Sequence, residues 1–214
     1  MKRFALSCAA LFTSAAACQA QTANEKIVDA ALSRLAGTMS VSYSPTFSGG
    51  SLSGCGIEFN ALVRNFAVRS GAYEKVTGSF GFMMANRTIA PVLKVVVHEI
   101  DRATMALSPA PPKRGYVVAG AKSNFASLHA SYPSDTPGAL FSIFKIEPTT
   151  SMYFEALAEG KLTIRYGRTP SGVDVPLALD LSVIETKDDG QRVKSAAPVN
   201  DMLSCMSSLL EAVQ

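Results

Sequence analysis

The chain has 214 residues, of which 48% are hydrophobic and 17% charged, and its formal net charge is +3. Two of the positive charges lie in an N-terminal leader, and without that leader 18 basic residues face 17 acidic ones. A nearly neutral chain lacks the clustered positive field that nucleic acids and acidic lipids require, so we expect no nucleic-acid partner. The length suits a single globular domain with a full hydrophobic core, which we place at residues 21–214.

Residues 1–20 have the pattern of a secretory signal peptide. Two basic residues precede a short run of small and apolar residues, and Ala20 ends a motif suited to cleavage. The mature protein is therefore expected to be periplasmic or secreted. The run is shorter than the roughly 20 apolar residues that span a bilayer, so we expect no transmembrane segment. A lipid anchor at Cys18 is the alternative, because three alanines precede this cysteine as in a bacterial lipobox.

Two cysteines, Cys55 and Cys205, remain after removal of the leader. An even number of cysteines in an oxidising compartment predicts one disulfide between them. Two buried free thiols are the alternative.

The mature chain begins with a predicted helix followed by a loop. Residues 24–38 carry apolar side chains at helical spacing, with a glycine near the end. Residues 40–54 are rich in serine and are interrupted by Pro45 and by Gly49-Gly50. This composition predicts a loop with at most one edge strand.

Residues 56–84 alternate between apolar and polar side chains and predict a long hairpin that turns at Ser70-Gly71. The apolar phase changes after Arg64, which predicts a β-bulge at Arg64-Asn65. Residues 89–100 are almost continuously apolar and predict a central strand buried on both faces.

The next segment begins with a proline-rich connector at residues 108–114, and a strand resumes at residues 116–118. Both a helix and a strand remain open for residues 121–137. Residues 139–146 predict a further strand with apolar side chains on both faces.

Residues 152–183 predict a short helix that ends at Gly160, followed by two strands. The second strand places six apolar side chains at period two: Val173, Val175, Leu177, Leu179, Leu181 and Val183. If the apolar faces of both strands coincide, two registers are allowed. One places Arg165 opposite Asp174, and the other places Lys161 opposite Asp180.

The C-terminal residues from Pro198 onward predict an amphipathic helix with one apolar stripe, made of Met202, Cys205, Met206, Leu209, Leu210 and Val213. The fold is therefore expected to be α+β and mostly β. We expect a curved antiparallel sheet of roughly seven to nine strands, forming a partly closed barrel or a sandwich, with the C-terminal helix packed on it and a short N-terminal helix.

The sequence offers little for catalysis or for cofactor binding. Besides the two cysteines it contains only the histidines His98 and His129, too few ligands for zinc once the cysteines are bridged. No nucleophile elbow, phosphate loop or dinucleotide motif occurs. A catalytic Cys55 thiolate beside a histidine would require that Cys55 is not in a disulfide. The paired carboxylates Glu155 and Glu159 are one helical turn apart, as is typical of a solvated helix face. We expect no catalytic residue, metal or cofactor.

We expect a non-catalytic bacterial cell-envelope protein that binds or scaffolds another envelope component, most simply another envelope protein. The candidate binding surface consists of Tyr43, Phe47 and Met83, the last because alternation places it opposite the core side of its strand. A carrier of a small apolar ligand inside the curved sheet is the first alternative, and a hydrolase without a recognisable motif is the second. A scaffold predicts an exposed apolar patch or an unpaired sheet edge, whereas a carrier predicts an enclosed apolar cavity.

Overall fold

The computed structural model describes residues 23–67 and 71–212. The leader, the predicted cleavage after Ala20 and Cys18 lie outside these ranges. Within them the chain forms a seven-stranded antiparallel sheet, a four-stranded antiparallel sheet and a two-stranded hairpin. No helix of the described ranges is both long and apolar enough to cross a membrane.

The described ranges contain three α-helices, α1 (Ala23–Leu35), α2 (Ile146–Glu159) and α3 (Ala197–Glu211), and one 3-10 helix, η1 (Phe125–Ser127). The seven-stranded main sheet contains β1 (Met39–Ser48), β2 (Ser51–Asn65), β3 (Ala72–Ala85), β4 (Thr88–Ile100), β5 (Leu107–Pro109), β8 (Leu128–Pro133) and β9 (Ala139–Phe144). The second sheet contains β6 (Arg114–Ala119), β7 (Lys122–Ser123), β10 (Lys161–Gly167) and β11 (Val175–Asp180), and the hairpin is β12 (Val183–Thr186) with β13 (Arg192–Lys194).

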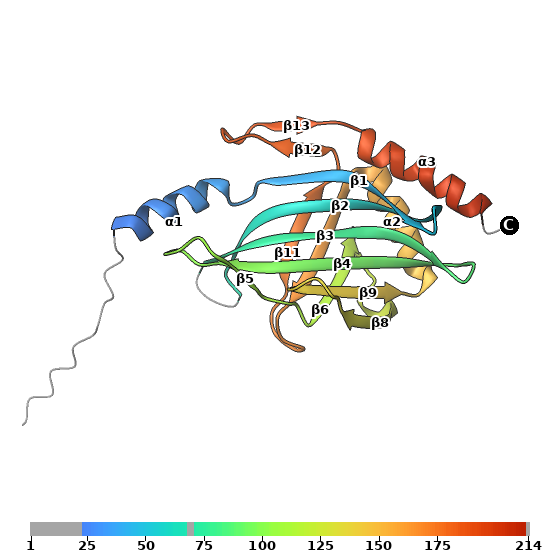
Figure 1. The fold of residues 1–214 in the computed structure, drawn as a ribbon, viewed down its shortest axis with the longest axis horizontal. Helices are drawn as coiled ribbons and strands as arrows, with labels where there is room; N and C mark the ends of the chain where they lie inside the picture. Colours follow the sequence, from blue (N-terminus) through green and yellow to red (C-terminus); the bar gives the residue numbers. More distant parts are fainter. Residues whose placement is uncertain (1–22, 68–70, 213–214) are drawn as a thin grey trace, which may run out of the picture.

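The predicted α+β, mainly β fold is confirmed, and of its two predicted forms the structure adopts the sandwich. The main sheet has the order β1-β2-β3-β4-β9-β8 and is not closed into a barrel. Strands β6 and β11 of the second sheet run across the strands of the main sheet behind it (Figure 1). One hydrophobic core joins the inner faces of both sheets to α2 and α3.

The main sheet starts with an element that we predicted to be largely a loop. Met39–Ser48 forms the ten-residue strand β1 at one edge of the sheet. An edge strand can hold Pro45, because a missing N–H on the outer side removes no ladder hydrogen bond. Gly49 and Gly50, both with positive φ, form the two-residue turn into β2 that a tight hairpin favours. The prediction of a loop was therefore wrong for most of this segment, whereas the edge strand that it allowed is confirmed.

The hairpin of β2 and β3 is confirmed, but the predicted bulge is not. Pairing continues in one register from Gly54 opposite Met83 to Asn65 opposite Ala72. Phe66 lies just beyond the end of β2 and is exposed, so the apparent phase change at Arg64-Asn65 marks the end of the strand. The register shift of this region instead lies in β1, between Thr46 and Phe47.

Strand β4 is the predicted central strand, paired with β3 on one side and with β9 and β5 on the other. Its middle is buried on both faces, from Val92 to Val97 apart from Lys94. At Gly78 of β3, a Cβ would lie only 2.0 Å from the Lys94 carbonyl oxygen. Glycine at this position therefore lets β3 and β4 approach closely.

The second sheet uses the register that places Lys161 opposite Asp180. Five of the six apolar residues predicted to share one face are buried, but Val173 is 73% exposed because β11 begins only at Val175. The strand also ends earlier than predicted, at Asp180, before the chain turns into β12.

Two helices close the core: α2 ends at Gly160 as predicted but starts at Ile146, so the strand predicted for 139–146 ends earlier, and α3 forms where predicted. Helix α3 packs over β1 and β2, and Cys205 forms the predicted disulfide with Cys55, with a Cα–Cα distance of 5.8 Å. Met202, Cys205, Met206 and Leu209 are buried, whereas Leu210 is half exposed and Val213 lies outside the described residues. Helix α2 packs against β4, β6 and β10.

The segment 121–137, which the sequence left ambiguous, forms β7, η1 and β8. Asn124 is fully buried there, and its Oδ1 accepts a hydrogen bond of 2.7 Å from the backbone N–H of Val117. This contact attaches η1 to β6 and so places β8 at the free edge of the main sheet.

Candidate functional site

The main sheet has one face turned away from the sandwich core, which we call the open face. Many of its side chains, which alternate with the buried ones of β1 to β4, are polar, and half of those named here are serines or a threonine: Ser40, Ser42, Ser44, Glu58, Asn60, Lys75, Thr77, Ser79, Lys94 and His98. A polar outer face is the ordinary arrangement of an antiparallel sheet. Here, however, the short side chains leave hollows in it.

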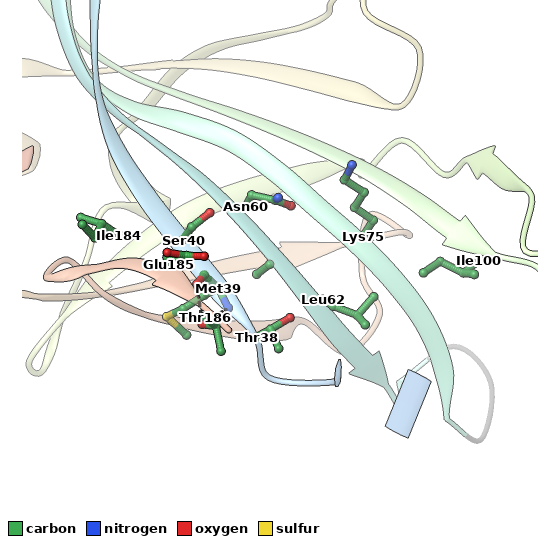
Figure 2. Close-up of a pocket in the computed structure, with 11 residues that line it drawn as sticks. Thr38, Met39, Ser40, Asn60, Leu62, Lys75, Ile100, Ile184, Glu185 and Thr186 are labelled. Atoms are coloured by element: carbon green, nitrogen blue, oxygen red, sulfur yellow. Dashed lines mark hydrogen bonds between the residues drawn. The ribbon is translucent and has the colours of Figure 1, made fainter. Parts of the chain in front are cut away.

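The first hollow, of about 350 Å³, lies between the open face and β12. Figure 2 shows Ser40, Asn60 and Lys75 on the strands of the sheet, with Ile184 and Glu185 coming from the hairpin. The remaining wall includes the apolar side chains of Leu62 and Ile100 together with the threonines Thr38 and Thr186.

Thr186 fixes this hollow at its β1 side. Its hydroxyl oxygen accepts a hydrogen bond of 3.2 Å from the Met39 N–H and donates one of 2.7 Å to the Met39 carbonyl. One side chain thus satisfies both backbone groups of an edge-strand residue. As a result, β12 covers this end of the β1 edge.

The second hollow, of about 390 Å³, lies over β2, β3 and β4. Glu58, Lys94 and His98 line it together with Ser44, Thr77, Ser79 and Thr136. Lys94 Nζ donates to Thr136 Oγ1 over 2.9 Å. Because Asn60 pairs with Thr77 and Lys75 pairs with His98, the two hollows lie side by side on the same face.

A different surface forms at the opposite edge of the sheet, around β8. No further strand of the described residues pairs with β8, and five of its six residues are exposed. Four large apolar side chains are exposed here, and we call them the β8 corner: Phe125 (52%), Leu128 (37%), Tyr132 (54%) and Ile146 (56%). A hydrogen bond of 2.8 Å from the Lys145 N–H to the Ser127 carbonyl joins the two segments that carry them.

A buried polar cluster at one end of the sandwich centres on Glu74. This carboxylate is fully buried and accepts hydrogen bonds from Tyr166 Oη (2.7 Å) and Asn65 Nδ2 (2.8 Å), and Arg168 bridges it to Glu99 at 3.4 and 2.9 Å. Burial, and then the adjacent Glu74 charge, raise the pKa of Tyr166 far above its usual value, so the phenol stays protonated as a donor. These groups supply one another's hydrogen-bond and charge partners, which is typical of a structural network.

A second polar cluster holds the loop between β10 and β11. Arg114 Nε donates to Asp174 Oδ1 over 2.6 Å, and its other nitrogens donate to the carbonyls of Thr169, Pro170 and Gly172. Tyr116 donates to Asp174 Oδ2 over 2.7 Å, and burial, followed by Asp174, raises the pKa of this phenol. The loop conformation is thus set by one guanidinium.

The structure does not bring the three predicted surface residues together. Tyr43 pairs with the buried Ile57 and packs against the core, whereas Met83 pairs with Gly54 and lies on the open face. Phe47 is 62% exposed near the end of β1.

The candidate catalytic residues are also separated. Cys55 is bonded to Cys205 and has no free thiol. His98 lines the open face, whereas His129 is exposed on β8. Glu155 is paired with Lys122 at 2.6 Å. In the ranges that the structure describes, no three acidic, histidine or cysteine side chains are grouped to hold a metal ion.

The sequence missed both surfaces for identifiable reasons. The serines at 40, 42 and 44 alternate with Val41 and Tyr43, a strand signal that Pro45 and the glycines obscured. The β8 corner depends on which strands are adjacent, and no local pattern specifies that. Comparisons with protein-family models, with curated proteins and with solved structures find no match to this chain.

Proposed function

We propose that this protein is a non-catalytic component of the bacterial cell envelope that binds another envelope protein through the β8 corner. The observation that carries the proposal is that an unpaired sheet edge and a group of exposed apolar side chains coincide there. Proteins usually protect such edges, and at β1 the hairpin β12–β13 and helix α3 lie alongside. Among the residues that the structure describes, none covers the β8 edge in a comparable way.

The expected mode of binding is strand addition. An extended segment of the partner would pair with the free backbone groups of β8, while its side chains contact Leu128 and Tyr132. Pro133 and the register shift between Leu128 and Ala130 limit the pairing to a few residues. A short edge of this kind favours a specific contact over open-ended sheet growth.

The disulfide and the N-terminal sequence support an extracytoplasmic location. Disulfides persist mainly in oxidising compartments, and the leader at residues 1–20 resembles a signal peptide. The carrier alternative has less support, because Tyr153 of α2 packs against Phe80 and Phe82, with ring centroids 5.4 and 5.5 Å away. The space beneath the hairpin is thus occupied by a core side chain.

Site-specific photo-crosslinking in the native envelope tests the proposal. A photoreactive phenylalanine analogue replaces Tyr132, and a matched variant carries it at Phe47, an exposed aromatic at the opposite edge of the sheet. We expect a discrete protein adduct from position 132 that disappears when Leu128→Lys is added. An adduct from position 47 alone, or no adduct from position 132 in folded protein, would contradict the β8 corner as the contact.

A further inference from the structure

The open face carries two hollows, away from the β8 corner. Its two hollows extend from β12 across β1, β2 and β3 to β4, so they offer an elongated rather than a compact site. Adjacent strands lie about 4.8 Å apart, so such a site is on the order of 15–20 Å long. A linear ligand fits this shape better than a small globular one.

The charges in the hollows are balanced. Lys75 and Glu185 line the first hollow, and Lys94 and Glu58 line the second. A polyanion would require a net positive field, and an apolar ligand would require an enclosed apolar wall. Balanced charge in an open polar groove therefore favours a ligand that is uncharged and polar.

The other lining groups are short hydrogen-bonding side chains. Ser40 and Asn60 line the first hollow, and Thr77 and Ser79 line the second, where the glycine backbone of Gly78 forms part of the floor. Hydroxyl and amide groups both donate and accept hydrogen bonds, which matches the hydroxyl groups of a sugar.

Apolar side chains flank the polar strip. Leu62, Ile100 and Ile184 lie at the first hollow, and Phe141, which pairs with Lys94 across β4 and β9, lies beyond the second. Phe141 also lines a smaller hollow of about 50 Å³ that shares Ser44 and Ser79 with the second one. An aromatic ring beside polar groups can contact the C–H face of a sugar ring.

We infer that the open face binds an uncharged, linear carbohydrate chain along these two hollows. The proposed function does not depend on this inference, because the β8 corner involves other residues.

A hollow of similar volume, about 390 Å³, on the second sheet serves as an internal control. Glu159 and Thr163 line it, but its acid Asp180 is already bound by Lys194 (2.8 Å) and by Ser182 (2.6 Å). The hydrogen bond from Lys194, and then that from Ser182, lower the pKa of Asp180 to about 2. The Asp180 carboxylate is therefore already engaged, and this hollow lies on a different sheet from the open face.

The test uses backbone-amide NMR shifts and calorimetry on the mature protein. The probes are a hexamer of N-acetylglucosamine and a hexamer of glucose, both neutral and linear, and a heparin hexasaccharide as the charged counterpart. We expect at least one neutral oligomer to shift amides of β1 to β4. The double variant Glu58→Ala with Asn60→Ala lacks two hydrogen-bonding groups and should bind the oligomer about tenfold more weakly, or weaker still.

The control variant, Glu159→Ala with Thr163→Ala, should bind as the unmodified protein does. The inference is overturned if neither neutral oligomer shifts the open-face amides at its highest soluble concentration, if heparin binds more tightly, or if both double variants weaken binding equally. Thermal unfolding of both variants verifies that they are folded. Variants at Phe125 and Ile146, which line neither hollow, should retain carbohydrate binding, so failure of this inference and failure of the β8 contact give different results.

Discussion

Glu74 is a fully buried carboxylate whose donors come from two strands and a loop. Asn65 is on β2, Tyr166 is on β10 and Arg168 follows β10, so the cluster joins the main sheet to the second sheet. Burying a charged carboxylate is costly unless hydrogen bonds compensate for the lost water. The cluster therefore stabilises the sandwich only while each donor is present.

Tyr166→Phe tests this dependence at a single atom. The substitution keeps the buried ring but removes the hydroxyl that donates to Glu74 Oε2 over 2.7 Å. We expect the free energy of unfolding to fall by about 1.5–3 kcal/mol, since the carboxylate loses a donor that water cannot replace. Denaturant unfolding measures the loss. Tyr132→Phe, at an exposed position, should change stability by no more than about 0.5 kcal/mol and is the matched control.

Single residues were the hardest feature to predict from the sequence. The alternation of side chains along β3 correctly predicted that Met83 lies on the face away from the core, because side-chain direction follows from position along the strand alone. Tyr43 was expected on a loop surface, but it packs against the core, since the segment around it is a strand. The Glu74 donors lie 9, 92 and 94 positions away in sequence, and no local pattern connects them.

At the scale of elements, hydrophobic periodicity predicted β2, β3, β4, β9, β10 and α3, where one or both faces are buried. It failed at β1, whose outward serines and Pro45 look like loop residues. The edge position of β1 explains the failure, because an edge strand tolerates proline and presents a polar face to solvent. The attachment of β1 to β12 depends on one side chain rather than on a strand ladder.

Replacing Thr186 with valine should expose the weakness of this attachment. Valine keeps the branched shape but can neither accept from the Met39 N–H nor donate to the Met39 carbonyl. We expect a loss of about 1–3 kcal/mol in unfolding free energy and faster amide exchange at Met39. Thr186→Ser keeps the hydroxyl and should restore the slow exchange. Equal exchange rates in the valine and serine variants would mean that the hydroxyl does not hold the edge.

At the scale of the whole molecule, the sequence predicted the fold class and the disulfide but not the assembly of the sheets. The pairing of β4 with β9 and of β6 with β10 joins segments that lie far apart in the chain. Such pairings are set by tertiary packing, as at Gly115, where a Cβ would contact Val95 of the facing sheet at 3.4 Å. The positions of the open face and of the β8 corner follow from this assembly, so neither could be read from periodicity.

The Cys55–Cys205 bridge joins residues 150 positions apart, and the loop that it closes contains the whole second sheet and all of the main sheet except β1 and the start of β2. Its loss should therefore affect the stability of the whole domain. Replacing both cysteines with serine should lower the free energy of unfolding by about 2–5 kcal/mol, because the unfolded chain regains the freedom that the bridge removed. Denaturant unfolding with and without reductant measures this.

Reduction of the bridge and replacement of both cysteines should lower the free energy of unfolding equally if the bridge acts through the unfolded chain. Reductant should bring the unmodified protein close to the stability of the double variant and leave that variant unchanged. Ser207→Ala, on the exposed side of α3, controls for changes in the helix itself and should be nearly neutral. A double variant as stable as the oxidised protein would show that the packing of Met202, Met206 and Leu209 holds α3 on the sheet without the bridge.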